Sequence, residues 1–187
     1  MHYKARRCII CICTIIIIVF SVFFLHRGGK YTQQQALKVV DRYQSQLENI
    51  AKYMINDSPN GRYLNMENSE DNYLNCSFVP QTIKEEIKVY FNQIAPQENG
   101  SIYVLRDDTK WYWHLSEVPK GKNIVSFFLY MGPFADDHET GNKMYECQML
   151  YYSDMTLGEL QALLNSTPIS VYEVFSIKEN WFLVTVR

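Results

Sequence analysis

The chain opens with a long apolar run and then changes to segments in which apolar and polar positions alternate. The run covers residues 8–25, contains no charged residue, and includes thirteen Ile, Val, Phe or Leu side chains. A helix of this length rises about 27 Å, close to the thickness of the hydrocarbon core of a bilayer. On the insertion scale its apolar side chains supply about −4 to −8 kcal/mol. The run therefore predicts a single-pass transmembrane helix.

Two other interpretations of the run are disfavoured by its length and surroundings. The apolar core of a cleaved signal peptide spans about 7–15 residues and ends at a small-x-small site. Residues 8–25 are longer than that and lead into His26 and Arg27 without such a site. A bacterial lipoprotein carries its cysteine at the far end of the run, whereas the three cysteines here lie at the near end. We therefore expect an uncleaved signal anchor.

The cations that flank the run predict its orientation. Lys4, Arg6 and Arg7 precede it, while Arg27 and Lys30 follow it. Because the side with more cations tends to stay in the cytoplasm, the N-terminus is predicted to be cytoplasmic. The expected organisation is a cytoplasmic tail at 1–7, the transmembrane anchor at 8–25, a hinge at 26–31 and an extracytoplasmic domain at 32–187.

Three segments beyond the anchor have helical periodicity and begin with the same signal. In each, a Thr is followed three residues later by Gln or Glu, as in a capping box: Thr32 with Gln35, Thr82 with Glu85, and Thr156 with Glu159. These signals predict helices over 33–56, 83–94 and 157–164. The first helix carries an apolar stripe, formed by Ala36, Val40, Tyr43, Leu47, Ile50 and Met54. The stripe predicts packing on a sheet, with a short parallel coiled coil between protomers as the alternative.

The remaining segments have the short apolar runs and the alternation that are typical of strands. We expect strands at 62–66, 124–131 and 144–152, a hairpin of 101–105 with 110–115, and a hairpin of 171–177 with 181–186. No βαβ alternation is present, so the predicted fold is α+β, with one long and two shorter helices and a five- to seven-stranded, mostly antiparallel sheet. This order of elements resembles a cystatin-like or NTF2-like arrangement, and the resemblance is one of layout alone.

The distribution of charge disfavours one class of partner. All twenty acidic residues lie beyond position 40, and three of the eighteen basic residues precede the anchor, so the outer part has a net charge near −5. A surface that binds nucleic acid needs clustered Lys and Arg residues, and the sequence has no such cluster. We therefore expect no nucleic acid partner. The outer part has the length of one domain and can bury a sizeable core.

The densest polar segment is a candidate metal site. Within residues 132–141, Asp136, Asp137, His138 and Glu139 offer oxygen and imidazole ligands for a divalent cation. Adjacent residues converge on one ion only when the backbone folds around it, and the spacing of a known calcium loop is absent. A solvated connecting loop is the alternative interpretation.

The densest aromatic segment is a candidate ligand platform. Trp111 and Trp113 would share one face of a strand, while Tyr112 and His114 would share the other. An exposed Trp face could stack on the sugar rings of a cell wall or on a peptide. Packing of both Trp side chains in the core is the alternative.

Cys76 and Cys147 are the two cysteines of the outer domain. In an oxidising compartment they could form a disulfide, and the long loop that it closes would be stabilised by about 4 kcal/mol. Two separate buried thiols are the alternative. Cys147 with His114 or His138 is also the only pairing that suggests a nucleophile and base, but no known motif of a hydrolase or of a cofactor site accompanies it. No cofactor is expected.

These features predict a membrane-anchored extracytoplasmic domain that binds a protein partner or acts as a scaffold in the cell envelope. An envelope hydrolase with its site near His114 or His138 is one alternative. A subunit of a secretion or conjugation complex is another, since an N-terminal anchor followed by an NTF2-like domain would suit such an assembly. The pattern favours a binding protein over an enzyme.

Overall fold

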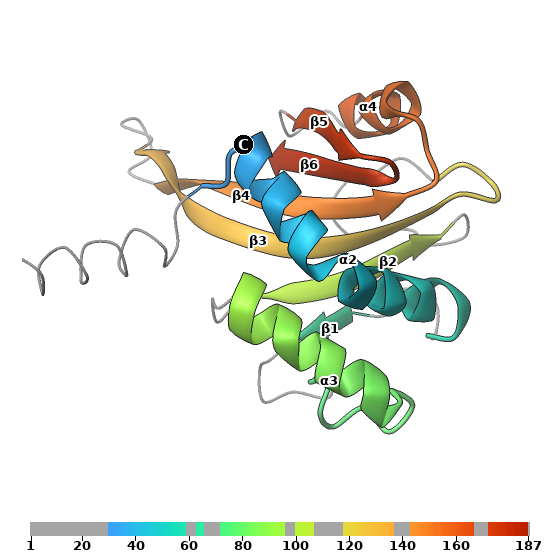
Figure 1. Cartoon of the computed structure of the whole chain (residues 1–187). Helices are drawn as coiled ribbons and strands as arrows, with labels where there is room; N and C mark the ends of the chain where they lie inside the picture. Colours follow the sequence, from blue (N-terminus) through green and yellow to red (C-terminus); the bar gives the residue numbers. More distant parts are fainter. Residues whose placement is uncertain are drawn as a thin grey trace, which may run out of the picture.

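The computed structural model describes residues 30–58, 63–65, 72–95, 100–106, 118–136, 143–166 and 172–186. Three helices, a π-helical turn and six strands follow one another along this part of the chain (Figure 1): α2 (Gln33–Asn56), β1 (Tyr63–Asn65), α3 (Gln81–Val89), η1 (Tyr90–Ile94), β2 (Ser101–Arg106), β3 (Asn123–Asp136), β4 (Lys143–Ser153), α4 (Leu157–Asn165), β5 (Tyr172–Lys178) and β6 (Trp181–Val186). The strands form one antiparallel sheet in the order β1-β2-β3-β4-β6-β5. The predicted α+β fold is confirmed.

The predicted anchor, the tail at 1–7 and the hinge residues 26–29 lie outside the described residues. Among the helices that the structure does describe, none is both long and apolar enough to cross a bilayer. The transmembrane anchor at 8–25 thus stays a prediction from the sequence.

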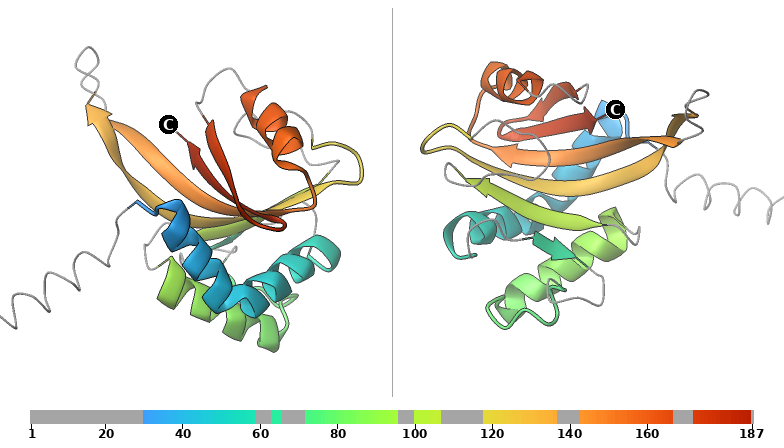
Figure 2. Two further views of the ribbon diagram at one scale, coloured as in Figure 1. Left: turned by 45° about the horizontal axis from the view of Figure 1, so that its top comes forward. Right: turned by 180° about the vertical axis from the view of Figure 1, so that it is seen from behind.

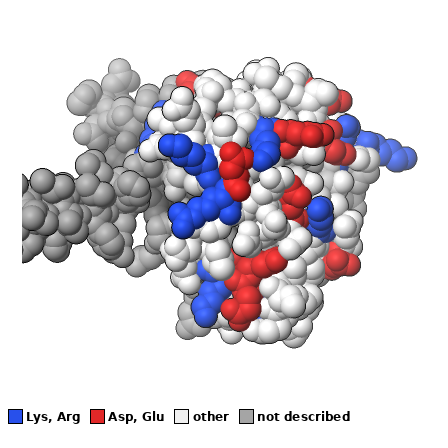
Figure 3. Space-filling model, viewed as in Figure 1, with Lys and Arg blue, Asp and Glu red and all other residues white. Residues whose placement is uncertain are grey.

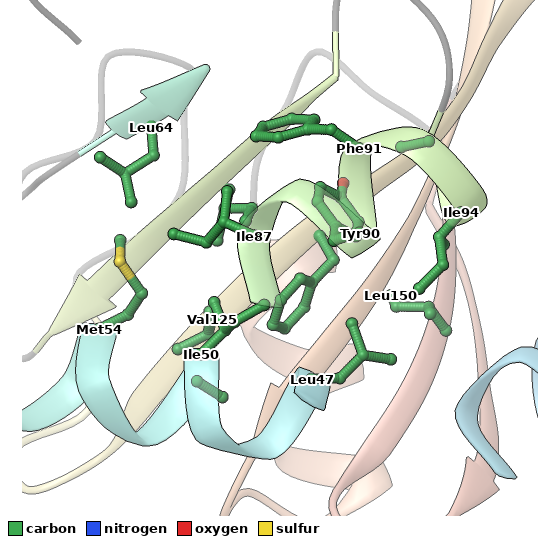
Figure 4. Packing of buried hydrophobic residues seen from close by; sticks show 14 of the residues in the cluster. Leu47, Ile50, Met54, Leu64, Ile87, Tyr90, Phe91, Ile94, Val125 and Leu150 are labelled. Carbon is green, nitrogen blue, oxygen red and sulfur yellow. The ribbon is translucent and has the colours of Figure 1, made fainter. Parts of the chain in front are cut away.

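The helix α2 lies across one face of the sheet together with α3 and η1 (Figures 1 and 2). Five of the six residues in its predicted stripe are fully buried there: Ala36, Val40, Leu47, Ile50 and Met54. The sixth, Tyr43, is half-buried at a kink where the backbone leaves helical angles (φ −118°, ψ 18°). Figure 4 shows part of this layer, where Leu47 and Ile50 lie beside Tyr90 and Val125. The stripe packs on the sheet, so the coiled-coil alternative is wrong.

α4 lies on the opposite face of the sheet (Figure 2). A second apolar cluster packs between α4 and the sheet. Leu160 and Leu164 of α4 are fully buried in this cluster with Val184 of β6. Because helices cover both faces of β6, five of its six residues are buried in succession rather than alternately. β4 also carries polar residues that are buried, among them Glu146 and Gln148.

Two of the three predicted capping boxes are present. The Thr32 and Thr156 side chains each accept a hydrogen bond from the backbone N–H three residues later. In turn, the side chains of Gln35 and Glu159 accept a hydrogen bond from the backbone N–H of Thr32 and Thr156. The third box is wrong, since α3 begins at Gln81 with Pro80 as its N-cap. Proline fixes φ near −65° and has no N–H to satisfy, so the chain enters the helix at Pro80 and Thr82 lies in the first turn.

Replacing Thr156 by alanine is expected to lower the free energy of unfolding by about 1 kcal/mol, because the N-cap of α4 is lost. Thr82→Ala is the matched control and should change it by less than about 0.5 kcal/mol, because that hydroxyl caps nothing. Urea denaturation followed by circular dichroism measures both values. Equal losses from the two variants would contradict the position of the α3 N-cap.

The stabilisation that the cap of α4 provides also depends on pH. The backbone N–H and the hydroxyl of Thr156 donate to the Glu159 carboxylate at 2.7 and 2.9 Å, and they lower the pKa of that carboxyl below its usual range. The stabilisation is therefore complete at neutral pH and is lost as the pH falls through the lowered pKa.

The C-terminal end of α2 is held by a cation from the sheet. One guanidinium nitrogen of Arg106, at the end of β2, donates to the carbonyl oxygens of Met54 at 2.7 Å and Ser58 at 3.0 Å. The Ser58 hydroxyl donates to the same Met54 carbonyl at 2.8 Å. The Met54 carbonyl lies in the last turn of α2, where the helix dipole has its negative end, so a cation is well matched to it.

The β3–β4 hairpin extends beyond the rest of the sheet (Figure 1). β3 pairs with β2 only from Asn123 to Phe127, and β4 pairs with β6 only from Cys147 to Tyr152. The ladder between β3 and β4 continues to Asp136 and contains two register shifts. Among the described strands, the outer part of this hairpin is therefore a two-stranded ribbon.

Candidate functional site: a polar row beside the start of α2

Four polar side chains from four adjacent strands form a row on the face of the sheet that α2 covers. Tyr130 of β3 is paired with Gln148 of β4, Gln148 with Thr185 of β6, and Thr185 with Glu173 of β5. We call these residues the polar row. The next pair on the same face of β4 and β6, two residues along each strand, is Leu150 with Leu183. Both belong to the apolar cluster under α2, so the row marks the place where that cluster ends.

The centre of the row is almost fully enclosed. Gln148 has 1% of its surface exposed and Thr185 has 2%. The Tyr130 side chain lies over Gly132, where an added Cβ would come within 1.8 Å of the Tyr130 hydroxyl oxygen. A glycine at position 132 therefore gives this ring room beside the row.

Gln148 binds the main chain of Tyr31 as a neighbouring strand would. Its Oε1 accepts a hydrogen bond from the Tyr31 N–H at 2.6 Å, and its Nε2 donates to the Tyr31 carbonyl at 3.1 Å. Nε2 also lies 3.3 Å from the Thr185 hydroxyl oxygen. A buried amide needs such partners, since an unmet hydrogen bond costs more than a made one gains.

Two further bonds, from Lys30 and from the Tyr31 hydroxyl, hold the same segment on the domain. Lys30 Nζ lies 2.8 Å from Oε1 of the buried Glu146 carboxylate, and the Tyr31 hydroxyl donates to the Ile94 carbonyl at 3.1 Å. Burial, followed by the neighbouring Tyr43, raises the pKa of Tyr31, so its hydroxyl remains a donor at neutral pH. We call Lys30 and Tyr31 the docked segment. The predicted hinge at 26–31 thus has its last two residues fixed on the sheet.

A groove of about 600 Å³ lies beside the docked segment and the row. Phe175 and Leu183 give it an apolar floor, and Thr185 and Glu173 add polar groups from the row. The remaining described residues that line it come from the docked segment, the start of α2 and β4: Lys30, Tyr31, Thr32, Gln33, Gln34 and Gln148. This combination can bind a peptide main chain through hydrogen bonds and an apolar side chain through contact.

Replacing Gln148 by leucine is expected to lower the free energy of unfolding by about 1–2 kcal/mol, because the Tyr31 N–H and carbonyl lose their partner. The Tyr31 amide should also exchange its hydrogen faster. Gln93→Leu makes the same chemical change at an exposed position of η1 and should alter neither quantity. Hydrogen exchange and urea denaturation measure the two effects. A Tyr31 amide that stays equally protected in Gln148→Leu would contradict the pairing.

The side chains of the predicted metal ligands fall outside what the structure describes. Asp136 is the last residue of β3, and its side chain is not among those described. Asp137, His138 and Glu139 lie outside the described residues. Within the described part of the chain, no group of three His, Cys, Asp or Glu residues could hold a metal ion. The metal site stays a prediction, as does the platform of Trp111 and Trp113, which lies in the undescribed range 107–117.

The structure places the two cysteines of the outer domain apart, as free thiols. Cys76 is buried in the cluster under α2 and α3, whereas Cys147 packs against the cluster on the opposite face. Burial, followed by the Glu146 carboxylate, raises the pKa of the Cys147 thiol, so it is protonated at neutral pH. A protonated thiol is a weak nucleophile, which makes Cys147 a poor candidate for catalysis.

The polar row was not found from the sequence. The only local signal was the pair of polar positions, Glu146 and Gln148, that alternate with apolar ones in β4. Thr185 and Glu173 come from other parts of the chain, and only the strand order aligns them with Gln148. Comparison of the chain with protein-family models, with curated protein sequences and with solved structures finds no match.

Proposed function

We propose that the chain is a single-pass, membrane-anchored extracytoplasmic domain that binds a protein partner in the cell envelope through the groove beside the polar row. The observation that carries this proposal is the docked segment. Four hydrogen bonds hold Lys30 and Tyr31 on the domain, to Glu146, Gln148 and Ile94. Only residues 26–29 separate this contact from the predicted anchor, and four residues span at most about 14 Å. The groove would then face the bilayer surface.

The chemistry of the groove supports an extended peptide segment as its ligand. Gln148 already pairs with the main chain of Tyr31, and the partly exposed Glu173 continues the row into the open part of the groove. Phe175, which is partly exposed in the groove, supplies apolar area for a side chain of the ligand. A juxtamembrane segment of an envelope protein would meet the groove at the height that the short linker allows.

Two other functions from the sequence have less support. An envelope hydrolase would use Cys147 with His114 or His138, yet burial keeps the Cys147 thiol protonated. A subunit of a secretion or conjugation complex rests on the cystatin-like or NTF2-like layout, for which the long α2 across an antiparallel sheet is the supporting feature. The binding function agrees best with the docked segment and the groove.

The orientation of the chain can be tested by labelling a cysteine introduced at Glu179, an exposed residue in the turn between β5 and β6. In intact cells, a maleimide that cannot cross the membrane should label Glu179→Cys well above the parent chain, in which Cys147 is a partly exposed free thiol. Labelling that needs cell lysis would place the domain in the cytoplasm and overturn the proposal.

The groove can be tested by photo-crosslinking in the same cells. A benzoyl-phenylalanine in place of Phe175 conserves the aromatic ring in the groove, and the same group in place of Lys88 provides a control on the exposed side of α3. We expect an adduct with a membrane protein from position 175 and none from position 88. Equal adducts from both positions, or none from either, would contradict binding in the groove.

A further inference from the structure

The docked segment uses the hydrogen-bonding groups that a ligand main chain in the groove would need. Gln148 Oε1 accepts a hydrogen bond from the Tyr31 N–H, and Gln148 Nε2 donates to the Tyr31 carbonyl and to the Thr185 hydroxyl oxygen. A side-chain amide has two N–H donors, so both donors of Gln148 are in use. The main chain of a ligand can therefore pair with Gln148 only after Tyr31 has left it.

The docked segment lies at the surface, where it can separate from the sheet. Lys30 and Tyr31 form one wall of the groove. The Lys30 side chain is 45% exposed, so the cation of the ion pair with Glu146 is already partly solvated. Tyr31 is half-buried at the margin of the apolar cluster under α2. Because neither residue is fully buried, the segment can leave without opening an enclosed cavity in the core.

The start of α2 does not depend on the docked segment. The Thr32 hydroxyl accepts from the Gln35 N–H at 3.3 Å, and Gln35 Oε1 accepts from the Thr32 N–H at 2.8 Å. The Ala36 N–H donates to the Thr32 carbonyl at 2.9 Å. All of these bonds lie within α2 and its N-cap. The chain can therefore turn between Tyr31 and Thr32 while the first turn of the helix stays folded.

Exposed charges do not provide another way to control the groove. On the face seen in Figure 3, the acidic and basic side chains of the described residues are interspersed. Interspersed charges largely cancel at a distance and steer a charged partner weakly. The interaction that the docked segment and a ligand would share is thus main-chain pairing with Gln148.

We propose that the docked segment is an autoinhibitory strap, which occupies Gln148 in the closed state and frees it for the main chain of a ligand when it is released. This inference rests on the proposed function, since the strap regulates the same groove. Release would also lengthen the tether. Residues 26–29 span at most about 14 Å, whereas 26–31 span at most about 21 Å, so the open state lets the domain stand further from the bilayer.

A release variant tests the strap in the full chain. Lys30→Met combined with Tyr31→Phe removes the ion pair to Glu146 and the hydroxyl bond to Ile94, and it leaves Gln148 in place. In nanodiscs, the amide at position 31 should exchange its hydrogen at least tenfold faster than in the parent chain, while the Ala36 amide should be unchanged. Equal acceleration at both positions would show that α2 unravels with the segment, and would overturn the strap.

Photo-crosslinking from benzoyl-phenylalanine at position 175 then measures the groove in cells. We expect the release variant to raise the adduct yield at least threefold over the parent chain. Lys38→Met, a matched change at an exposed position of α2, should leave the yield unchanged. A yield that is equal or lower in the release variant would overturn the strap and leave binding in the groove intact. An absence of adduct in every variant would contradict the proposed function, and the strap with it.

Discussion

Replacing Trp181 by alanine is expected to lower the free energy of unfolding by about 3–5 kcal/mol, the largest effect of any single change considered for this fold. Trp181 begins β6 and has 1% of its surface exposed. Its ring lies 5.0 Å from that of Tyr152 and 5.8 Å from that of Phe127, centroid to centroid. Alanine would remove both aromatic contacts and leave a cavity under α2.

The matched control for this change is Trp181→Phe. The indole N–H of Trp181 is buried and donates to none of the residues that the structure describes, so phenylalanine gives up no polar partner among them and keeps an aromatic ring in place. We expect less than half of the loss seen with alanine. Urea denaturation followed by circular dichroism gives both values. A loss in Trp181→Phe as large as that in Trp181→Ala would show that the indole N–H has a partner after all.

Replacing Arg106 by methionine is expected to lower the free energy of unfolding by about 2–3 kcal/mol. The change removes two charge-assisted hydrogen bonds to the Met54 and Ser58 carbonyls while keeping a side chain of similar length. It also removes the cation at the negative end of the α2 dipole. The amide hydrogens in the last turn of α2 should exchange faster as that turn loosens.

The control for this prediction is Arg106→Lys, which keeps the positive charge but presents it as a single ammonium group. We expect it to recover about half of the loss, because one carbonyl can still be reached. Hydrogen exchange at Asp57, whose N–H donates to the Tyr53 carbonyl, reports on the same turn. If Arg106→Met and Arg106→Lys were equally unstable, the charge would contribute nothing and only the shape of the guanidinium would matter.

The helix α2 was predicted with both of its ends because three local signals agree. The Thr32 capping box marks its start, the apolar stripe sets its period, and Asp57 with the Pro59 and Gly61 that follow marks its end. The three signals lie within one stretch of sequence and need no distant contact. The same holds for α4 and for the β5–β6 hairpin, whose turn places Asn180 at φ 62°, a conformation that asparagine tolerates.

The strand predictions depend on non-local pairing that the sequence does not show. A hairpin of 101–105 with 110–115 was expected, and it stays a prediction because 107–117 lies outside the described residues; β2 pairs with β3 along one edge and, at Ser101–Tyr103, with β1 along the other. β3 was expected to end at Met131, before Gly132 and Pro133, yet the strand continues to Asp136 through a register shift. Glycine and proline end a regular strand but are tolerated at a bulge or on a strand edge.

The candidate site was harder to predict for the same reason. Gln148 and Thr185 are 37 positions apart, and the register of β4 against β6 makes them neighbours. The docked segment is separated from Gln148 by more than a hundred residues. Hydrophobic periodicity identifies elements and their buried faces, but it carries no information on which distant strands share an edge.

The projecting end of the β3–β4 hairpin bears on how the protein remains dispersed at high concentration. Beyond Phe127 on β3 and Cys147 on β4, the described ribbon has two edges that other strands of the domain leave open, and such edges attract strands of other molecules. Pro133 lacks a donor for a foreign strand, and the two register shifts disturb the regular spacing that edge-to-edge pairing requires. The irregularities that carry β3 beyond its predicted end at Met131 thus protect the ribbon against aggregation.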